Sequence, residues 1–302
     1  MIDVDRCYCC QSSAFEFLFE QTADDPYLHL IGKAEGPSAS KWMVCRGCGF
    51  VSQTPQLGPG DIDGLYRDYR LNEFRGETPD AYFDRISSYP PEESENFKKV
   101  EWLNKAGAVG AADGGKILDI GCGGGVLLHS FLRRDPDWIA HGVEPTPNFA
   151  ELAGRRLNSD VRSCSYEAGL FGHQFDLISM VQVLEHVADP VEFVRQAKSD
   201  LSADGYLYVE VPDVHDFCDL APTHDRFMAP HLWYFSEQSL GHLCRRAGLA
   251  PVRFDREFTV RNRNNLQALC RHADTKVEPA WDTNHWQDVK SLFELNEHAG
   301  AS

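Results

Sequence analysis

The chain has 302 residues, of which 29 are basic and 46 acidic, so its formal net charge is −17 at pH 7. This excess of negative charge opposes general electrostatic binding to nucleic acid and to anionic membranes. The length accommodates one sizeable domain and one small domain. No apolar run is long enough to span a membrane, and the first residues lack a signal-peptide core. We therefore expect a soluble, cytoplasmic protein.

Two Cys-x-x-C pairs lie near the start of the chain, separated by 34 residues. Four thiolates form the ligand set of a structural zinc site, and each pair supplies two from one tight turn. The separation exceeds the usual spacing, so we expect a small excursion with strands near 15–19 and 41–44. The predicted module covers 1–55, and its expected Zn²⁺ ligands are Cys7, Cys10, Cys45 and Cys48.

Two alternatives remain open for these cysteines. Cys9 could replace one ligand, because C-x-C and C-x-x-C overlap at the first pair. Two disulfides, or a redox-active pair, would use the same residues, but disulfides are rare in reducing compartments. Zinc remains the main prediction, since metal binding can stabilise a module too small to have a sufficient core.

A linker or lid segment is expected over 56–93, and its polar part, 61–91, is expected to be partly helical. An amphipathic helix within 92–107 follows, with acidic residues at its start. This helix introduces a domain that we place at 94–272. The remaining residues, 273–302, are expected to form a helical tail.

The sequence KILDIGCGGG, residues 116–125, runs from an apolar strand into four glycines. Glycine lets the main chain approach a ligand without a Cβ in the way, and free N–H groups at the start of the next helix attract anions. A dinucleotide fingerprint would have its third glycine at Val126. The pattern instead resembles D-x-G-x-G-x-G, the first motif of the class I S-adenosylmethionine-dependent methyltransferases, at every fixed position.

The downstream sequence extends this resemblance in the same order. Further strands are expected at 138–143, 160–164, 175–180 and 205–212, the last after a turn at 203–205. The segment VQVLEHVADP, residues 181–190, closely resembles the one that follows the fourth strand in many family members. The resemblance covers about residues 94–271. It implies an α/β fold with a Rossmann-like, seven-stranded sheet.

The resemblance also implies S-adenosyl-L-methionine as the cofactor. Asp119 would orient the methionine ammonium, and Gly121 and Gly123 would offer backbone contacts. A carboxylate such as Glu144, at the end of the second strand, can accept bonds from both ribose hydroxyls. The remaining expected contacts are Ser165 and Tyr166 near the adenine, and Gln182 and Leu184 around the sulfonium.

The acceptor side should lie after the fifth strand. Ser236 is expected to cap a helix, and two strands at 250–258 and 264–271 are expected to form an edge hairpin. The segment APHLWYFS resembles the EHxxYFS box of zinc-containing sugar C-methyltransferases, in which the histidine is a proposed general base. That histidine is His231 here, although Pro230 stands in place of the glutamate, which disfavours C-methylation.

A base within hydrogen-bond reach assists a hydroxyl acceptor, and histidine is the usual choice. We predict His231 as this base and His186 as the second candidate, while His141 and His173 are expected at the surface. The predicted reaction is methyl transfer to a small polar acceptor, for which the resemblance implies a sugar or nucleotide-sugar hydroxyl. Three alternatives stay open: C-methylation of a keto-sugar, an inactive zinc-ribbon interaction protein, and a nicotinamide-dependent dehydrogenase.

Overall fold

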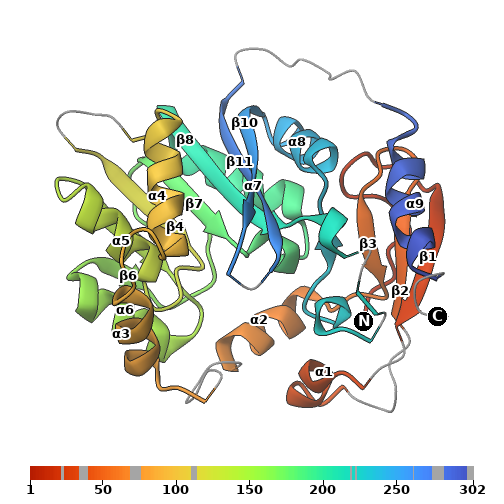
Figure 1. The fold of residues 1–302 in the computed structure, drawn as a ribbon, viewed down its shortest axis with the longest axis horizontal. Helices are drawn as coiled ribbons and strands as arrows, with labels where there is room; N and C mark the ends of the chain where they lie inside the picture. The colour runs from red at the N-terminus through yellow and green to blue at the C-terminus, as the bar shows by residue number, and fades with distance from the viewer. Residues whose placement is uncertain are drawn as a thin grey trace.

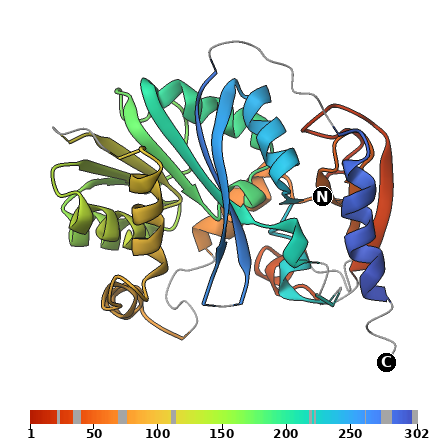
Figure 2. The same ribbon diagram turned by 45° about the horizontal axis from the view of Figure 1, so that its top comes forward.

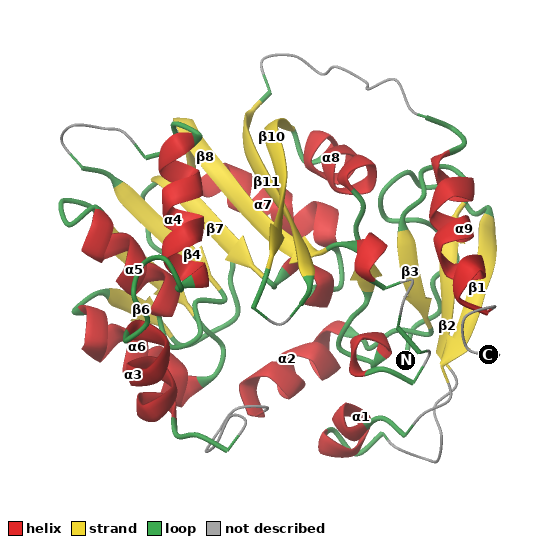
Figure 3. Cartoon of the chain, viewed as in Figure 1, coloured by secondary structure: helices red, strands yellow, loops and turns green. Residues whose placement is uncertain are grey.

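The computed structural model describes residues 1–21, 24–33, 40–68, 76–109, 114–217, 220–221, 223–260, 262–273 and 282–297. Two β-sheets organise these residues, one of seven strands and one of four. The sheets lie side by side, with helices packed around them (Figure 1; Figure 3). In the described part, no helix has the length and apolar character that a membrane crossing requires.

The small sheet is assembled from two distant parts of the chain. Its first strands are β1 (Phe15–Gln21), β2 (Ser40–Cys45) and β3 (Val51–Thr54), which pair antiparallel in that order. The fourth strand, β9 (Trp233–Tyr234), pairs with β3. Helix α9 (His285–Glu297) packs against β1 and β2, as Figure 2 also shows. The strands expected near 15–19 and 41–44 are therefore confirmed, but the partner β9 was not anticipated.

The helices that precede the large sheet have clear local causes. They are α1 (Pro26–Leu30), α2 (Pro59–Asp68), α3 (Pro79–Ser87) and α4 (Glu95–Lys105). Thr78 and Ser94 cap α3 and α4, because each side chain accepts a bond from a backbone N–H of the first turn. The helix predicted within 92–107 is confirmed as α4.

The large sheet has the order of strands that places a binding crevice at one edge. Its strands are β4 (Lys116–Ile120), β5 (Ile139–Val143), β6 (Asp160–Arg162), β7 (Phe175–Val181), β8 (Leu201–Pro212), β10 (Leu249–Phe258) and β11 (Asn264–His272). They are arranged β10-β11-β8-β7-β4-β5-β6, with β11 antiparallel to both neighbours. The strand order reverses at β4, and ligands bind outside the carboxyl ends of the strands at such a point. The seven-stranded α/β fold expected from the sequence is confirmed.

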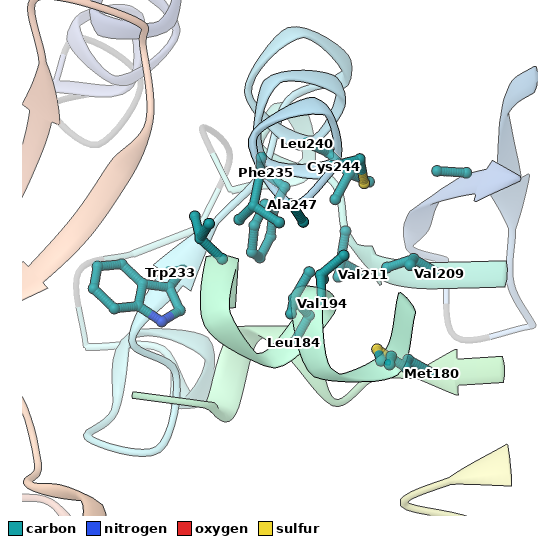
Figure 4. Packing of buried hydrophobic residues seen from close by; sticks show 14 of the residues in the cluster. Met180, Leu184, Val194, Val209, Val211, Trp233, Phe235, Leu240, Cys244 and Ala247 are labelled. Atoms are coloured by element: carbon teal, nitrogen blue, oxygen red, sulfur yellow. The ribbon is translucent and has the colours of Figure 1, made fainter. Parts of the chain in front are cut away.

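Helices cover both faces of this sheet. The remaining long helices are α5 (Val126–Arg134), α6 (Pro147–Leu157), α7 (Pro190–Asp200) and α8 (Glu237–Arg246). α4, α5 and α6 share one hydrophobic core with the sheet, and α7 and α8 share the other. Figure 4 shows part of the second core, with Met180 on β7, Val194 on α7 and Leu240 on α8.

Two expectations about the sheet were wrong. Residues 203–205 lie inside β8 rather than in a turn, and a Cβ at Gly205 would stand 2.9 Å from the Phe175 carbonyl oxygen. The glycine therefore serves close strand packing. His141 is buried on β5, which pairs with β4 and β6, and its ring packs edge-on against Phe171 and Phe175. His173 is half-buried beside it, with the two ring centroids 4.9 Å apart.

Candidate functional site

The glycine loop, residues 121–125, connects β4 to α5 at the carboxyl edge of the sheet. Gly121 has a φ of +73°, and a Cβ there would stand 2.6 Å from Val183 Cγ2. Gly125, at +82°, forms the N-cap of α5. The backbone N–H groups of Gly121 and Cys122 both donate to the Val143 carbonyl, at 2.8 and 3.1 Å. This loop needs glycine for its backbone shape and for the close approach of neighbouring side chains.

Asp119 is a buried carboxylate just before the glycine loop. Its side chain accepts one hydrogen bond, of 2.7 Å, from the Ser179 hydroxyl. Burial raises the pKa of this carboxyl to about 7, and the nearby charge of Glu144 contributes to the same direction. Within the described residues, no cationic side chain forms an ion pair with Asp119. A ligand that brings a cation would therefore be stabilised here.

Glu144 stands at the end of β5 and links two loops. One carboxylate oxygen accepts a bond from the Gly123 N–H and the other from the Thr146 N–H, both at 2.9 Å. These bonds hold the carboxylate at the edge of the crevice. The side chain is 6% exposed and has lone pairs left for further donors.

Two cavities lie on either side of the glycine loop. The first, of about 460 Å³, is bordered by α2 and α7 and by the segments that follow β5, β6 and β7. The second, of about 740 Å³, lies between the glycine loop, α3 and α4. Gly121 and Gln182 border both cavities. An elongated ligand could therefore pass from one cavity to the other over these two residues.

Gln182 has unusual geometry at this junction. Its φ is +56°, a left-handed value that is uncommon for a residue with a side chain. The backbone N–H donates to the Glu210 carbonyl oxygen at 2.8 Å, while the side-chain Nε2 is buried and has no hydrogen-bond partner in the described part. Strained backbone and an unsatisfied donor at one residue are typical of ligand sites.

Ser165 and Tyr166 border the first cavity, as the sequence predicted. The Ser165 hydroxyl donates to Asp63 of α2 at 3.1 Å, and the Tyr166 hydroxyl donates to Asp200 at 2.7 Å. Thr146 makes a second bond to α2, donating to the Tyr66 carbonyl oxygen at 2.8 Å. These contacts hold α2 in place as one wall of the first cavity.

Among the predicted cofactor residues, Leu184 alone borders neither cavity. It is fully buried in the core between the sheet and α7, as Figure 4 shows. The short helix that contains it, Leu184–His186, turns the leucine inward and brings the histidine toward the first cavity.

The two candidate histidines lie together, with ring centroids 4.9 Å apart in a stacked arrangement. His186 borders the first cavity, and His231 packs against its ring. The Nδ1 atom of His186 bonds the Pro230 carbonyl at 2.8 Å, and that of His231 bonds the Arg226 carbonyl at 2.7 Å. Since a carbonyl can only accept, Nδ1 is the protonated nitrogen in each neutral ring, and Nε2 has a lone pair.

Glu185, next to His186, was not singled out from the sequence. It is 1% exposed, and neither carboxylate oxygen has a hydrogen-bond partner in the part of the chain that the structure describes. Burial raises the pKa of this carboxyl to about 8. One oxygen lies 3.6 Å from His186 Nε2, so its charge state affects the neighbouring imidazole.

A second group missed by the sequence analysis lies in the second cavity. Lys99 of α4 is buried and pairs with Glu257 at 2.7 Å and with Glu210 at 3.3 Å. Glu210 also accepts bonds from Tyr208 at 2.9 Å and from Asn265 at 2.8 Å. The signal for this group was an acidic residue inside the otherwise apolar strand segment YLYVEVP. This buried group makes the wall of the second cavity strongly polar.

The four predicted zinc ligands gather in one cluster. Their sulfur atoms all lie within 4.8 Å of one another, with 3.6 Å between Cys7 and Cys48 and 3.4 Å between Cys10 and Cys45. Cys9 lies outside this group of four, and its sulfur donates to the Ser239 carbonyl at 3.6 Å.

Comparisons with known proteins agree with this geometry. The methyltransferase domain family matches residues 84–253. A ubiquinone biosynthesis O-methyltransferase from Neisseria meningitidis serogroup C (strain 053442) is 28% identical over 231 residues, which cover 68% of this chain and 94% of that protein. One from Acinetobacter baylyi is 27% identical over 133 residues, 42% of this chain and 55% of that protein.

Among solved structures, the magnesium protoporphyrin IX methyltransferase of Synechocystis PCC 6803 with bound S-adenosylmethionine has a similar fold. The TM-score is 0.51 at 13% identity, covering 73% of this chain and all of that one. Neither a dehydrogenase nor an inactive scaffold is supported by these relatives. The chain belongs to the methyltransferase domain family, and it is an S-adenosylmethionine-dependent methyltransferase.

Proposed function

We propose that this enzyme methylates a hydroxyl of a small polar acceptor that is held beside the stacked histidines. The observation that carries the proposal is the position of His186 at the first cavity, with His231 stacked on it and Nδ1 of each ring bonded to a carbonyl. This arrangement leaves a basic Nε2 in each neutral ring, which can take a proton from a hydroxyl.

S-adenosylmethionine, when bound, supplies an electrophilic methyl group. The residues of the chain hold the two partners in line and remove the proton of the acceptor. Asp119, buried without a cationic partner in the described part, would pair with the methionine ammonium, and Gly121 and Gly123 would offer backbone contacts. Gln182, whose Nε2 lacks an acceptor, would bond the ligand where the two cavities meet.

The adenosine would occupy the part of the first cavity that Glu144, Ser165 and Tyr166 border, and the acceptor would lie beside His186 at the same cavity. Glu144 would accept bonds from the ribose hydroxyls, and Ser165 and Tyr166 would border the adenine. Leu184 would act from the core, by supporting the turn that carries His186. These roles fit the residues present, since the cavity offers a carboxylate for the hydroxyl donors of the ribose and an apolar wall for the adenine ring.

His231 and His186 are both candidates for the base. The resemblance to the EHxxYFS box favours His231, whereas the lining of the first cavity favours His186. Replacing each by asparagine separates the roles, because the base variant should lose turnover and keep cofactor affinity. A variant with turnover close to that of the wild type would exclude that histidine as the base.

For the acceptor, we propose a hydroxyl of a sugar or nucleotide-sugar. The resemblance of residues 229–236 to sugar methyltransferases supports it, and the names of the curated relatives, O-methyltransferases, support oxygen as the methyl acceptor. A screen of nucleotide-sugars for transfer of labelled methyl tests the proposal. Incorporation into a phenolic compound with none into any sugar would overturn the acceptor class.

C-methylation of a keto-sugar is the second candidate. It would use the same histidines to remove a proton from carbon. The resemblance of APHLWYFS to the EHxxYFS box supports it, whereas Pro230 in place of the glutamate weighs against it. Exchange of deuterium from solvent into a sugar carbon would identify this reaction. Methyl transfer to oxygen without such exchange would exclude it.

We further propose that the cysteine cluster binds a structural Zn²⁺. A tetrahedral ion with sulfurs at about 2.3 Å requires sulfur–sulfur distances of about 3.8 Å, and the distances of 3.4 and 3.6 Å in the cluster are close to this value. The proposed organisation is a zinc module at 1–55, a lid segment at 56–93, the cofactor domain at 94–272 and a helical tail at 273–302. Metal analysis should find one zinc per chain.

A further inference from the structure

We propose that the N-terminal cysteine module, together with Gln56 directly after it, positions the catalytic histidines through three residues that hold the histidine segment 229–232. The positioning residues are Asp25, Gln53 and Gln56, which are 4%, 1% and 4% exposed. The inference rests on the proposed role of the histidines as the base. It assigns a role in the reaction to a module whose residues line neither the glycine loop nor the second cavity.

The module holds both ends of the histidine segment. At the start, the Ala229 N–H donates to the Asp25 carboxylate at 2.7 Å. At the end, the Leu232 carbonyl oxygen accepts two bonds of 3.0 Å, one from the Gln53 backbone N–H and one from Gln56 Nε2. All of these bonds are shielded from water, so losing one leaves a buried polar group unsatisfied.

The opposite side of the same segment bonds the turn that carries His186. The Pro230 carbonyl accepts from His186 Nδ1 at 2.8 Å, and the Leu232 N–H donates to the Glu185 carbonyl at 2.8 Å. Residues 229–232 therefore lie between the module and the Glu185–His186 turn, with bonds to each. A shift of the module would move His231 and would release the bond that sets the tautomer of His186.

The cysteine cluster is connected to this contact by a short path. β3 begins three residues after Cys48 and pairs with β9, with Val51 opposite Tyr234. The Phe50 ring stacks on Trp233 with centroids 5.4 Å apart, and Trp233 Nε1 donates to the Val187 carbonyl at 2.7 Å. A metal ion that fixes the second cysteine pair would fix the start of β3, and through β9 the end of the histidine segment.

The test removes one of the side-chain hydrogen bonds to the histidine segment, called a clamp below, without adding charge. Gln56→Met keeps the size of the side chain but cannot donate to the Leu232 carbonyl. Gln238→Met is the matched control, because Gln238 Nε2 also donates to a backbone carbonyl, that of Asp282, at 3.2 Å and away from both large cavities. Asp25→Ala removes the other clamp and provides a second variant.

Two measurements on the full chain distinguish positioning from general damage. Imidazole signals in NMR spectra, assigned with histidine variants, report the surroundings of His186 and His231, and calorimetry with S-adenosylhomocysteine reports the cofactor site. We expect Gln56→Met and Asp25→Ala to shift both imidazole signals and to leave the affinity for S-adenosylhomocysteine within about twofold. With the acceptor from the screen, kcat should fall about tenfold to a hundredfold, as small misplacements of catalytic groups do.

The control Gln238→Met should change none of these values. Unchanged imidazole signals in both clamp variants would overturn the proposal, as would a loss of S-adenosylhomocysteine affinity that parallels the loss of kcat. The NMR measurement needs no acceptor, so failure to find methyl transfer would count against the proposed function and not against the positioning role.

Discussion

The glycine loop and the histidine segment serve the same reaction but are held in different ways. The loop is fixed by the β4-α5-β5 unit that contains it. Gly121 and Cys122 bond to Val143, and Gly123 bonds to Glu144. The histidine segment is fixed by residues that lie far away in the sequence, with Asp25 separated from Ala229 by 204 positions. Cofactor binding is thus encoded locally, whereas the geometry of the base depends on the assembly of the whole chain.

The largest test of this contrast removes a cysteine ligand. Cys45→Ser should abolish zinc binding and lower the free energy of unfolding by several kcal/mol, since structural zinc contributes apparent binding energies of order 10 kcal/mol. Metal analysis and denaturant unfolding measure the two effects. Cys9→Ser is the control, because Cys9 lies outside the four-sulfur cluster and its sulfur donates to the Ser239 carbonyl at 3.6 Å, so zinc should stay in place. Full zinc content in Cys45→Ser would refute the ligand set.

A second test changes the cofactor site, the part of the molecule that is encoded locally. Glu144→Ala removes the carboxylate proposed for the ribose hydroxyls, and hydrogen bonds to charged groups contribute about 1.5–3 kcal/mol. The affinity for S-adenosylhomocysteine should therefore fall at least tenfold, as measured by calorimetry, while the imidazole signals of His186 and His231 stay unchanged. Glu151→Ala, at an exposed position of α6, is the control. Equal affinity in the two variants would exclude the ribose role.

The pH dependence of cofactor affinity sharpens the role of Asp119. Burial raises the pKa of its carboxyl to about 7, so the group is ionised above that pH and neutral below it. Only the ionised form attracts an ammonium, and affinity for S-adenosylhomocysteine should fall as pH drops through 7, by up to about tenfold per unit. Asp119→Asn should bind weakly and without this dependence. A wild-type affinity that stays constant from about pH 5.5 to 8 would contradict the assignment.

The smallest expected effect concerns the lid. Thr146→Val removes the bond of 2.8 Å to the Tyr66 carbonyl, and a neutral hydrogen bond contributes about 0.5–1.5 kcal/mol. We expect S-adenosylhomocysteine to bind a few-fold more weakly. Ser159→Ala is the control, since it removes a similar bond of 3.3 Å, to Leu157, away from the cavities. A Thr146→Val affinity equal to that of the control would show that α2 needs no such tether.

The local part of this architecture was predictable from the sequence. The glycine loop, the acidic residue at the end of β5 and the strands of the large sheet are contiguous patterns. Each appears where it was expected, except that β8 begins at Leu201, before the predicted turn. Ser236, which was predicted to cap a helix, begins α8, because capping acts over three or four residues. Such features follow from short-range backbone chemistry.

The parts that were missed depend on contacts between distant residues. β9 has two residues and no periodicity, and only its pairing with β3 makes it a strand. Glu210 and His141 are buried because helices cover the sheet. Glu210 also depends on its buried partner Lys99. Leu184 borders neither cavity because the turn at 184–186 directs it into the core. Sequence periodicity contains no information about these pairings.

The most direct test of the account is calorimetry of the full chain with S-adenosylhomocysteine and, separately, with NADH. We predict that S-adenosylhomocysteine binds at one site per chain, since the crevice at β4 and β5 offers Asp119 for an ammonium and Glu144 for a ribose. We predict that NADH does not bind, since Val126 stands where the dinucleotide fingerprint has its third glycine. Binding of NADH alone, or of neither compound, would contradict the account.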